Sequence, residues 1–144
     1  MSLFQENDFI SHSGLTLSWK IDCDSLNDED IQTLAGIIGN RYGFKKVIGI
    51  PSGGDRLASA LKQYEDPELW STLIVDDVLT TGASMEEARE NLGDDMVMGV
   101  VIFSRMIAED CPSWIKPLFQ AWDLEDPDWL SKTIEKDMKS REKV

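Results

Sequence analysis

The chain is poor in cysteine and histidine and has no long apolar run. Its 144 residues include two cysteines, Cys23 and Cys111, and one histidine, His12. With no Cys-x-x-Cys pair and no second histidine, we expect neither a disulfide scaffold nor a structural zinc site. No stretch approaches the roughly 20 apolar residues of a membrane span, and the first residues lack the basic and apolar regions of a signal peptide. We therefore expect a cytoplasmic protein.

Basic residues are scarce as well. Lys and Arg number 14 against 27 Asp and Glu, and the formal net charge is -13. A nucleic-acid-binding protein needs a basic face for phosphates, so the charge excludes that partner, and it excludes an anionic membrane surface for the same reason. A small anionic ligand is still compatible with this charge, because backbone N–H groups together with a divalent metal can hold it.

The remaining composition is that of one globular domain. The chain is 42% hydrophobic and 28% charged, which is typical of a folded protein with one core. Neither a repeat nor a Pro/Gly/Ser-rich linker interrupts it. Because this length is common for a single domain, we predict one domain over residues 1–144.

Apolar runs and helical periodicity alternate through the middle of the chain. Three short apolar runs predict buried strands at residues 47–50, 72–75 and 96–103. Helical spacing predicts helices over 27–42 and over 57–64. A third helix is predicted to begin at Ser84, where Glu87 completes a capping box. Continuous apolar strands separated by helices predict an α/β fold, with a parallel sheet flanked by helices.

The two ends of the chain are less regular. Residues 4–23 alternate loosely between apolar and polar, which predicts a strand outside the main sheet. Residues 114–122 have helical spacing, although Pro117 prevents a long helix there. Another helix is predicted to start at Asp126 and Pro127. The apolar face of that helix consists of Leu130, Ile134 and Met138.

Ligand sites in parallel sheets lie at the carboxyl ends of the strands, and the richest loop follows residues 72–75. Two carboxylates, Asp76 and Asp77, leave this strand, and a turn rich in hydroxyls then enters a helix. A helix N-terminus binds phosphate, and paired carboxylates accept hydrogen bonds from sugar hydroxyls or bind Mg²⁺. A sugar phosphate satisfies both halves of the pattern. The alternative is an acidic strand end followed by a capped helix.

Residues 73–84 resemble the phosphoribosyl-pyrophosphate (PRPP) motif of type I phosphoribosyltransferases. The resemblance implies that Asp76 and Asp77 are catalytic residues that hold the ribose hydroxyls and Mg²⁺. It also implies a cradle for the 5-phosphate, made of Thr80, Thr81, Gly82, Ala83 and Ser84. The segment after the first apolar strand resembles the pyrophosphate loop of the same family and contains Ser52, Gly53, Gly54 and Asp55.

The N-terminal residues resemble one branch of this family. Residues 9–14 and 18–22 are similar to the hood of orotate phosphoribosyltransferases, with His12 at the position of a ligand-holding lysine. Arg105 stands where that branch has an arginine that contacts orotate, and a guanidinium suits a planar carboxylate. The resemblance implies base-binding roles for Arg105, His12 and Lys20, and a homodimer. From the residues alone, Arg105 could equally be a surface arginine and His12 a polar strand residue.

One segment departs from the orotate branch. Those enzymes carry a long mobile loop, rich in Lys and Arg, that closes over the leaving group. Here residues 62–72 offer one lysine and three acidic residues. Gly53 also replaces the lysine of their pyrophosphate loop.

The leading hypothesis is a Mg²⁺-dependent phosphoribosyltransferase that joins a nucleobase to PRPP and releases diphosphate. Orotate or a related pyrimidine is the favoured base. The alternative from another class is a non-catalytic PRPP-binding sensor or regulatory subunit, which the missing basic loop favours. A scaffold that binds nothing is the third reading.

Overall fold

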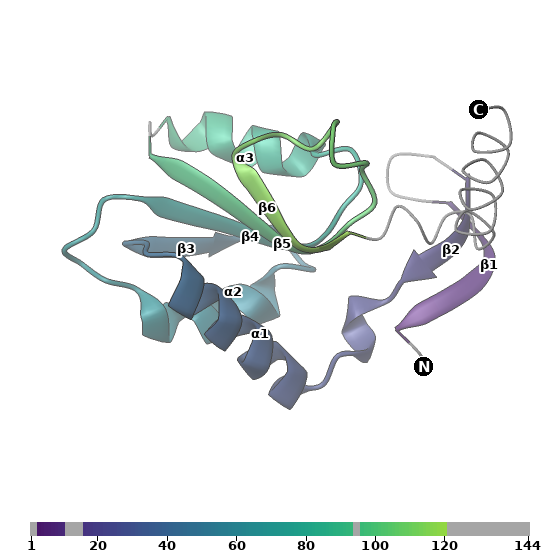
Figure 1. Ribbon diagram of the computed structural model, residues 1–144, viewed down its shortest axis with the longest axis horizontal. Coiled ribbons are helices and arrows are strands. Elements are labelled where there is room, and N and C mark those ends of the chain that lie inside the picture. The colour runs from purple at the N-terminus through teal and green to yellow at the C-terminus, as the bar shows by residue number, and fades with distance from the viewer. Residues whose placement is uncertain (1–2, 11–15, 94–95, 121–144) are drawn as a thin grey trace, which may run out of the picture.

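The computed structural model of the chain describes residues 3–10, 16–93 and 96–120 (Figure 1). In the ranges 4–10 and 16–21 it describes the course of the backbone but not the side chains. No helix in the described ranges is long and apolar enough to cross a membrane.

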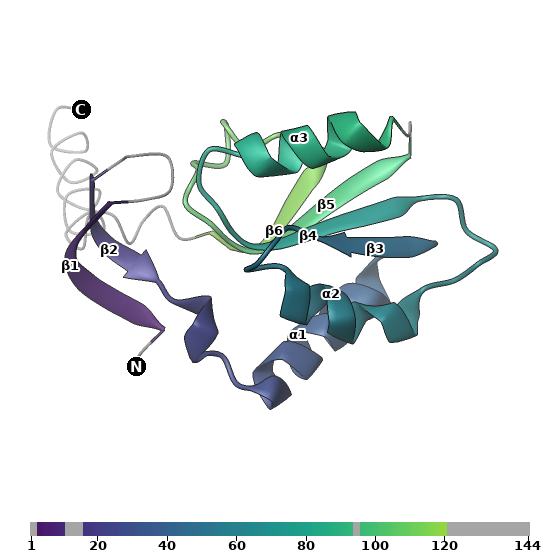
Figure 2. The ribbon, with the colours of Figure 1, turned by 180° about the vertical axis from the view of Figure 1, so that it is seen from behind.

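The main sheet consists of parallel strands with helices on both faces. Its four strands lie in the order β3 (Lys46–Gly49), β4 (Thr72–Leu79), β5 (Val97–Ser104) and β6 (Ile115–Gln120). Helices α1 (Asp28–Arg41) and α2 (Asp55–Leu61) cover one face, and α3 (Ala83–Leu92) covers the other (Figures 1 and 2). The predicted α/β fold with a flanked parallel sheet is confirmed.

Helix α1 confirms the helix predicted over 27–42. The Asp30 N–H donates to Asn27 Oδ1 at 2.8 Å, and the Asn27 N–H donates to Asp30 Oδ2 at 3.0 Å. This capping box satisfies two N–H groups that the helix itself leaves unpaired. The buried face is the periodic apolar set Ile31, Leu34, Ala35 and Ile38.

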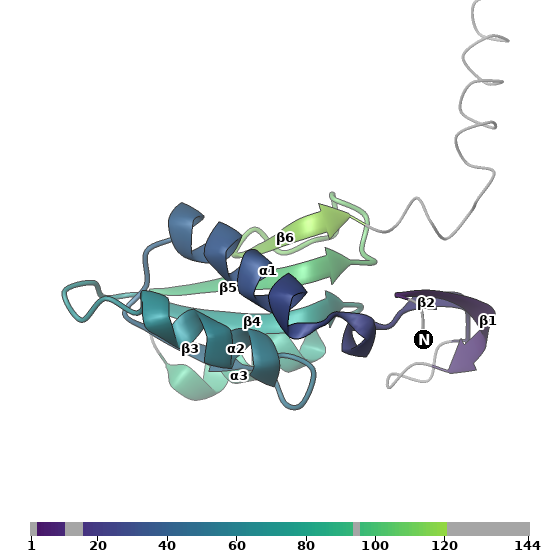
Figure 3. The same ribbon diagram turned by 90° about the horizontal axis from the view of Figure 1, so that it is seen from below.

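The connection through α2 has an unusual hand. Strands β3, β4 and β5 follow one another in one direction across the sheet, yet α2 and α3 lie on opposite faces (Figures 1 and 3). The two crossovers therefore have opposite hands, and the left-handed one is β3–α2–β4. About 98% of such units are right-handed. A right-handed connection from α2 would lead to the far side of β3, whereas residues 62–71 return directly to β4.

This return segment, which begins with the short 3-10 helix η2 (Lys62–Tyr64), covers the outer edge of β3. The Val47 N–H donates to Glu65 Oε2 at 2.9 Å. Nearby, the Asp66 N–H donates to Phe44 O at 3.0 Å. Because these groups are satisfied within the chain, the edge is less able to pair with a strand of another molecule.

The N-terminal region forms a separate sheet. Strands β1 (Phe4–Ile10) and β2 (Thr16–Ile21) pair antiparallel, and a short 3-10 helix, η1 (Cys23–Ser25), joins them to α1. The predicted strand outside the main sheet is confirmed, and the structure adds its antiparallel partner.

The helical spacing of residues 114–122 does not lead to a helix in the part that the structure describes. Ile115–Gln120 is strand β6, which pairs with β5 in parallel. Pro117 stands inside this strand opposite Val101. A proline is tolerated there because β6 is the last strand of the described sheet, where a missing N–H interrupts no second ladder. The helix predicted from Asp126 lies outside the described residues.

The core fills both faces of the sheet. In β4, Leu73 and Val75 pack with the α1 and α2 side, whereas Ile74 packs with the α3 side. All three are fully buried, as expected for a central parallel strand covered on both faces. This packing holds the carboxyl end of β4 in place, and the acidic pair stands there.

Candidate active site

Asp76 and Asp77 lie within β4, which runs on to Leu79 and is longer than the predicted strand 72–75. Both residues are half-buried. The Asp77 N–H donates to Asp76 Oδ1 at 2.8 Å, and the Val78 N–H donates to Asp77 Oδ1 at 2.7 Å. Each carboxylate is thus oriented through one oxygen by the backbone.

Burial raises the pKa of Asp76 to about 7, and the side chain of Asp77 beside it adds to this effect. Loss of water disfavours the charged form, and so does a second carboxyl at close range. Near neutral pH Asp76 therefore readily exchanges a proton. A divalent cation or several hydroxyl donors would stabilise the ionised form.

The loop after β3 packs directly against this pair. A Cβ atom on Gly53 would lie 2.5 Å from Asp77 Oδ2, and one on Gly54 would overlap the carbonyl oxygen of Val75. The Ile50 N–H donates to that same carbonyl at 2.9 Å. Only glycine fits at 54, and a larger residue at 53 would displace the Asp77 carboxylate, because β3 and β4 bring the two loops together. Residues 52–55 therefore lie against the acidic pair, as their positions after neighbouring strands predict.

Half of the predicted N–H donors of this loop are used within it. The Gly54 N–H donates to Ile50 O at 2.8 Å, and the Asp55 N–H donates to Ser52 O at 3.1 Å. Within the described part of the chain, the N–H groups of Ser52 and Gly53 have no acceptor. Both residues are exposed, and the Pro51–Ser52 peptide is cis. The loop offers two open N–H donors.

The loop after β4 is more open. Its N-cap residue is Gly82, at φ 81°, which has no side chain to cap the helix. The predicted capping box of Ser84 and Glu87 is wrong, because Ser84 lies inside the first turn of α3. The N–H donors in the first turn of α3 are thus available to a ligand, and a helix N-terminus of this kind is suited to a phosphate group.

The hydroxyl side chains of this loop face solvent. Thr80, Thr81 and Ser84 are exposed, as is Ala83, while Gly82 is buried. The Ala83 N–H makes a long bond of 3.4 Å to Thr81 Oγ1. The five residues predicted to cradle a phosphate therefore surround one helix N-terminus.

Arg105 lies at the same edge of the sheet. Its N–H donates to Leu79 O at 2.9 Å, which places its backbone beside the start of the loop after β4. The residue is only 9% exposed and makes further interactions within the protein. The reading of Arg105 as a surface arginine is therefore wrong.

Sequence reasoning missed one residue near the site. Cys23, in η1, is buried, and burial raises the pKa of its thiol to about 12, with the charge of Asp77 adding to the effect. A thiol with this pKa is a poor nucleophile. Nothing in the sequence around Cys23 indicates its proximity to Asp77, because the two are brought together only by the fold.

Two predicted base-binding groups cannot be placed. His12 and the side chain of Lys20 lie outside what the structure describes. Among the described residues, no three His, Cys, Asp or Glu side chains gather into a metal site. The chemistry of Asp76 and Asp77 still fits Mg²⁺, which is commonly held by one or two carboxylates together with substrate oxygens and water.

Comparison with solved structures identifies this arrangement as the fold of type I phosphoribosyltransferases. Orotate phosphoribosyltransferase from Aeropyrum pernix matches with a TM-score of 0.65 and 21% identity, over 82% of this chain and 88% of that one. Leishmania donovani adenine phosphoribosyltransferase matches with a TM-score of 0.61 and 12% identity, over 82% and 75%.

A longer protein matches as well. Leishmania donovani UMP synthase has a TM-score of 0.65 and 17% identity, over 91% of this chain and 36% of that one. No protein-family model and no curated protein sequence matches the chain. The structural matches show the fold, and at these sequence identities they show nothing more.

Proposed function

We propose that the chain is a phosphoribosyltransferase, which moves the phosphoribosyl group of PRPP to a nucleobase and releases diphosphate. The observation that carries this proposal is the contact between Gly53 and Asp77. It joins an acidic pair suited to ribose hydroxyls to a loop with open N–H donors. The open N-terminus of α3 supplies a phosphate site at the same sheet edge.

Each part of PRPP then has a partner. The 5-phosphate binds at the N-terminus of α3, the ribose hydroxyls donate to Asp76 and Asp77, and the diphosphate accepts from the N–H groups of Ser52 and Gly53. Mg²⁺, when bound by Asp76, Asp77 and substrate oxygens, neutralises charge on the diphosphate. The C1–O bond to diphosphate breaks and a C1–N bond to the base forms. The residues act by positioning and by stabilising charge.

Orotate is the base we propose first. Arg105, with His12 and Lys20, would bind its carboxylate and ring. The structural matches include enzymes named for orotate and for adenine, so the choice rests on the N-terminal resemblance and on Arg105. We also propose that the protein acts as a homodimer.

A second candidate is a PRPP-binding protein without turnover. It is favoured by the path of residues 62–71, which reach the sheet at Thr72, the amino end of β4. Thr72 and Asp76 are separated by roughly 13 Å along the strand. The segment covers the edge of β3 and lies near the amino ends of the strands, whereas the loops of the candidate site lie at the carboxyl ends. It is therefore not placed to close over a leaving group.

Two measurements test these proposals. Calorimetry with PRPP, with and without Mg²⁺, measures binding, and diphosphate release with orotate, uracil, adenine, guanine and hypoxanthine measures turnover. We expect Asp76→Asn with Asp77→Asn to weaken PRPP binding at least 100-fold. The control double variant, Glu109→Gln with Asp110→Asn, removes the same charge from an exposed turn and should bind normally.

The outcomes separate the readings. Binding with turnover of one base supports the transferase and identifies its substrate. Binding without release for any base leaves the sensor. If both double variants bind PRPP as well as the parent, the site assignment is wrong.

A further inference from the structure

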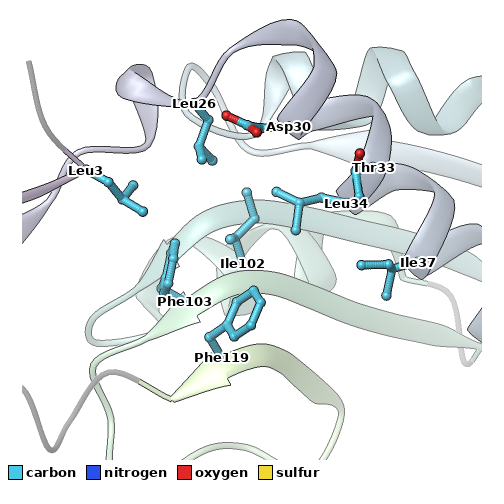
Figure 4. Close-up of a pocket in the computed structure, with 9 residues that line it drawn as sticks. All are labelled: Leu3, Leu26, Asp30, Thr33, Leu34, Ile37, Ile102, Phe103 and Phe119. Atoms are coloured by element: carbon cyan, nitrogen blue, oxygen red, sulfur yellow. The ribbon is translucent and has the colours of Figure 1, made fainter.

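An open apolar groove lies between α1 and the strands β5 and β6, with Leu3 and Leu26 at its N-terminal border (Figure 4). Its volume is about 530 Å³. Leu34 and Ile37 line it from α1, and Ile102, Phe103 and Phe119 line it from the sheet. Asp30 and Thr33 are its polar members. Neither Asp76, Asp77 nor either catalytic loop contributes to it.

The groove leaves large apolar side chains exposed. Phe119 is 50% exposed and Ile37 is 37% exposed. In Figure 4 the side chains from α1 face those from β5 and β6 across the groove. Burial of such surface is favourable in proportion to its area, so a matching apolar segment would bind here.

The chain itself supplies a candidate at this position. Phe119 lines the groove, and the described chain ends one residue later at Gln120, with residues 121–144 following. Residues 121–126 can span roughly 20 Å when extended. Helix α1, with 14 residues, is about 21 Å long. The residues after Asp126 can therefore reach any part of the groove.

The sequence after Asp126 has the required pattern. Leu130, Ile134 and Met138 recur every four residues and lie on one face of a helix. A helix over 127–138 is about 18 Å long. An isolated helix of this length is marginal in water and needs a surface that buries its apolar face.

We propose that residues 127–138 form a helix that docks in cis into the groove between α1 and β6, with Leu130, Ile134 and Met138 against Ile37, Ile102 and Phe119. This helix completes the cover of the α1 face of the sheet. The proposal is independent of the reaction at the other site.

Two full-length double variants test the docking. Leu130→Gln with Ile134→Gln removes the apolar face, whereas Asp128→Asn with Lys132→Gln changes the opposite face, and neither alters the net charge. Hydrogen exchange is measured by mass spectrometry across α1 and β6. We expect the first variant to exchange at least 10-fold faster there and to unfold several degrees lower. The second should match the parent, and β3 and β4 should stay protected in both.

A groove variant tests the same contact from the other side. Ile37→Gln, at a partly exposed position, should speed exchange of residues 127–138, and its effect should not add to that of Ile134→Gln. Equal exchange in both tail variants overturns the proposal. Protection that rises with protein concentration also overturns it, because the segment would then come from a second copy.

Discussion

The two loops at the carboxyl edge of the sheet differ in how many of their N–H donors are already used within the protein. The loop after β3 is held tightly: two of its N–H groups donate within it, and its glycines touch β4. The loop after β4 enters a helix of ten residues whose N-cap, Gly82, has no side chain to compete for the first donors. The loop after β3 therefore packs against the Asp77 carboxylate and limits its position, whereas the loop after β4 leaves N–H donors open.

The two loops therefore have different requirements for holding a phosphate group. An open helix N-terminus can bind a phosphate without assistance. A loop with two free donors cannot neutralise a diphosphate in a chain of charge -13. In the proposed function, Mg²⁺ would therefore be needed at the diphosphate end, whereas the helix N-terminus would hold the 5-phosphate.

Within this comparison, the largest effect on ligand binding is expected at the loop after β3. In Gly53→Ala the added Cβ would lie 2.5 Å from Asp77 Oδ2, so the carboxylate must move. Overpacking of this kind costs on the order of 1–3 kcal/mol, and we expect PRPP affinity to fall roughly 10- to 100-fold in calorimetry.

The control is Gly43→Ala, whose Cβ would meet only the flexible end of Leu69. Binding of inorganic phosphate at α3 should survive in both variants. Normal PRPP binding by Gly53→Ala would show that this contact has no role in the site.

An intermediate effect on ligand binding is expected at the loop after β4. Gly82 has φ 81°, and Gly93, at the other end of α3, has φ 61°. Alanine in this left-handed region costs about 1–2 kcal/mol, so both variants should lose similar stability. Only Gly82→Ala should weaken inorganic phosphate binding, by about 10-fold. Equal phosphate binding by the two variants would place the phosphate elsewhere.

The smallest effect concerns the pH dependence of stability. Because the pKa of Asp76 is raised from 3.8 to about 7, the folded protein binds more protons than the unfolded chain between these values. This residue's contribution to stability therefore falls as pH rises through that window. Asp76→Asn should be more stable than the parent at pH 8, by on the order of 1 kcal/mol after solvent screening.

Thermal unfolding of the ligand-free proteins in EDTA measures this difference. At pH 4 the two proteins should unfold at nearly the same temperature, because Asp76 is then largely protonated in the native state. If the unfolding temperatures of the two proteins differ by the same amount at pH 4 and at pH 8, Asp76 does not titrate as described.

Local sequence signals succeeded where one element carried its own pattern. Helix α1 was predictable because its periodic apolar face and its Asn27 cap both lie within the segment. The start of α3 was not, since Ser84 and Glu87 fit a capping box and Gly82 takes the cap. The spacing of residues 114–122 fits a helix equally well, but pairing with β5 makes Ile115–Gln120 a strand.

By itself, the sequence determined the parallel α/β fold and the two loops that carry the candidate site. Continuous apolar strands that alternate with helical segments favour such a sheet, and adjacent carboxylates just before a helix start remain together in any fold of that class. Only the tertiary structure decided that Gly53 touches Asp77, that Arg105 is buried, and that β3–α2–β4 is left-handed. These features depend on which strands become neighbours, and no local pattern encodes a contact between residues far apart in the chain.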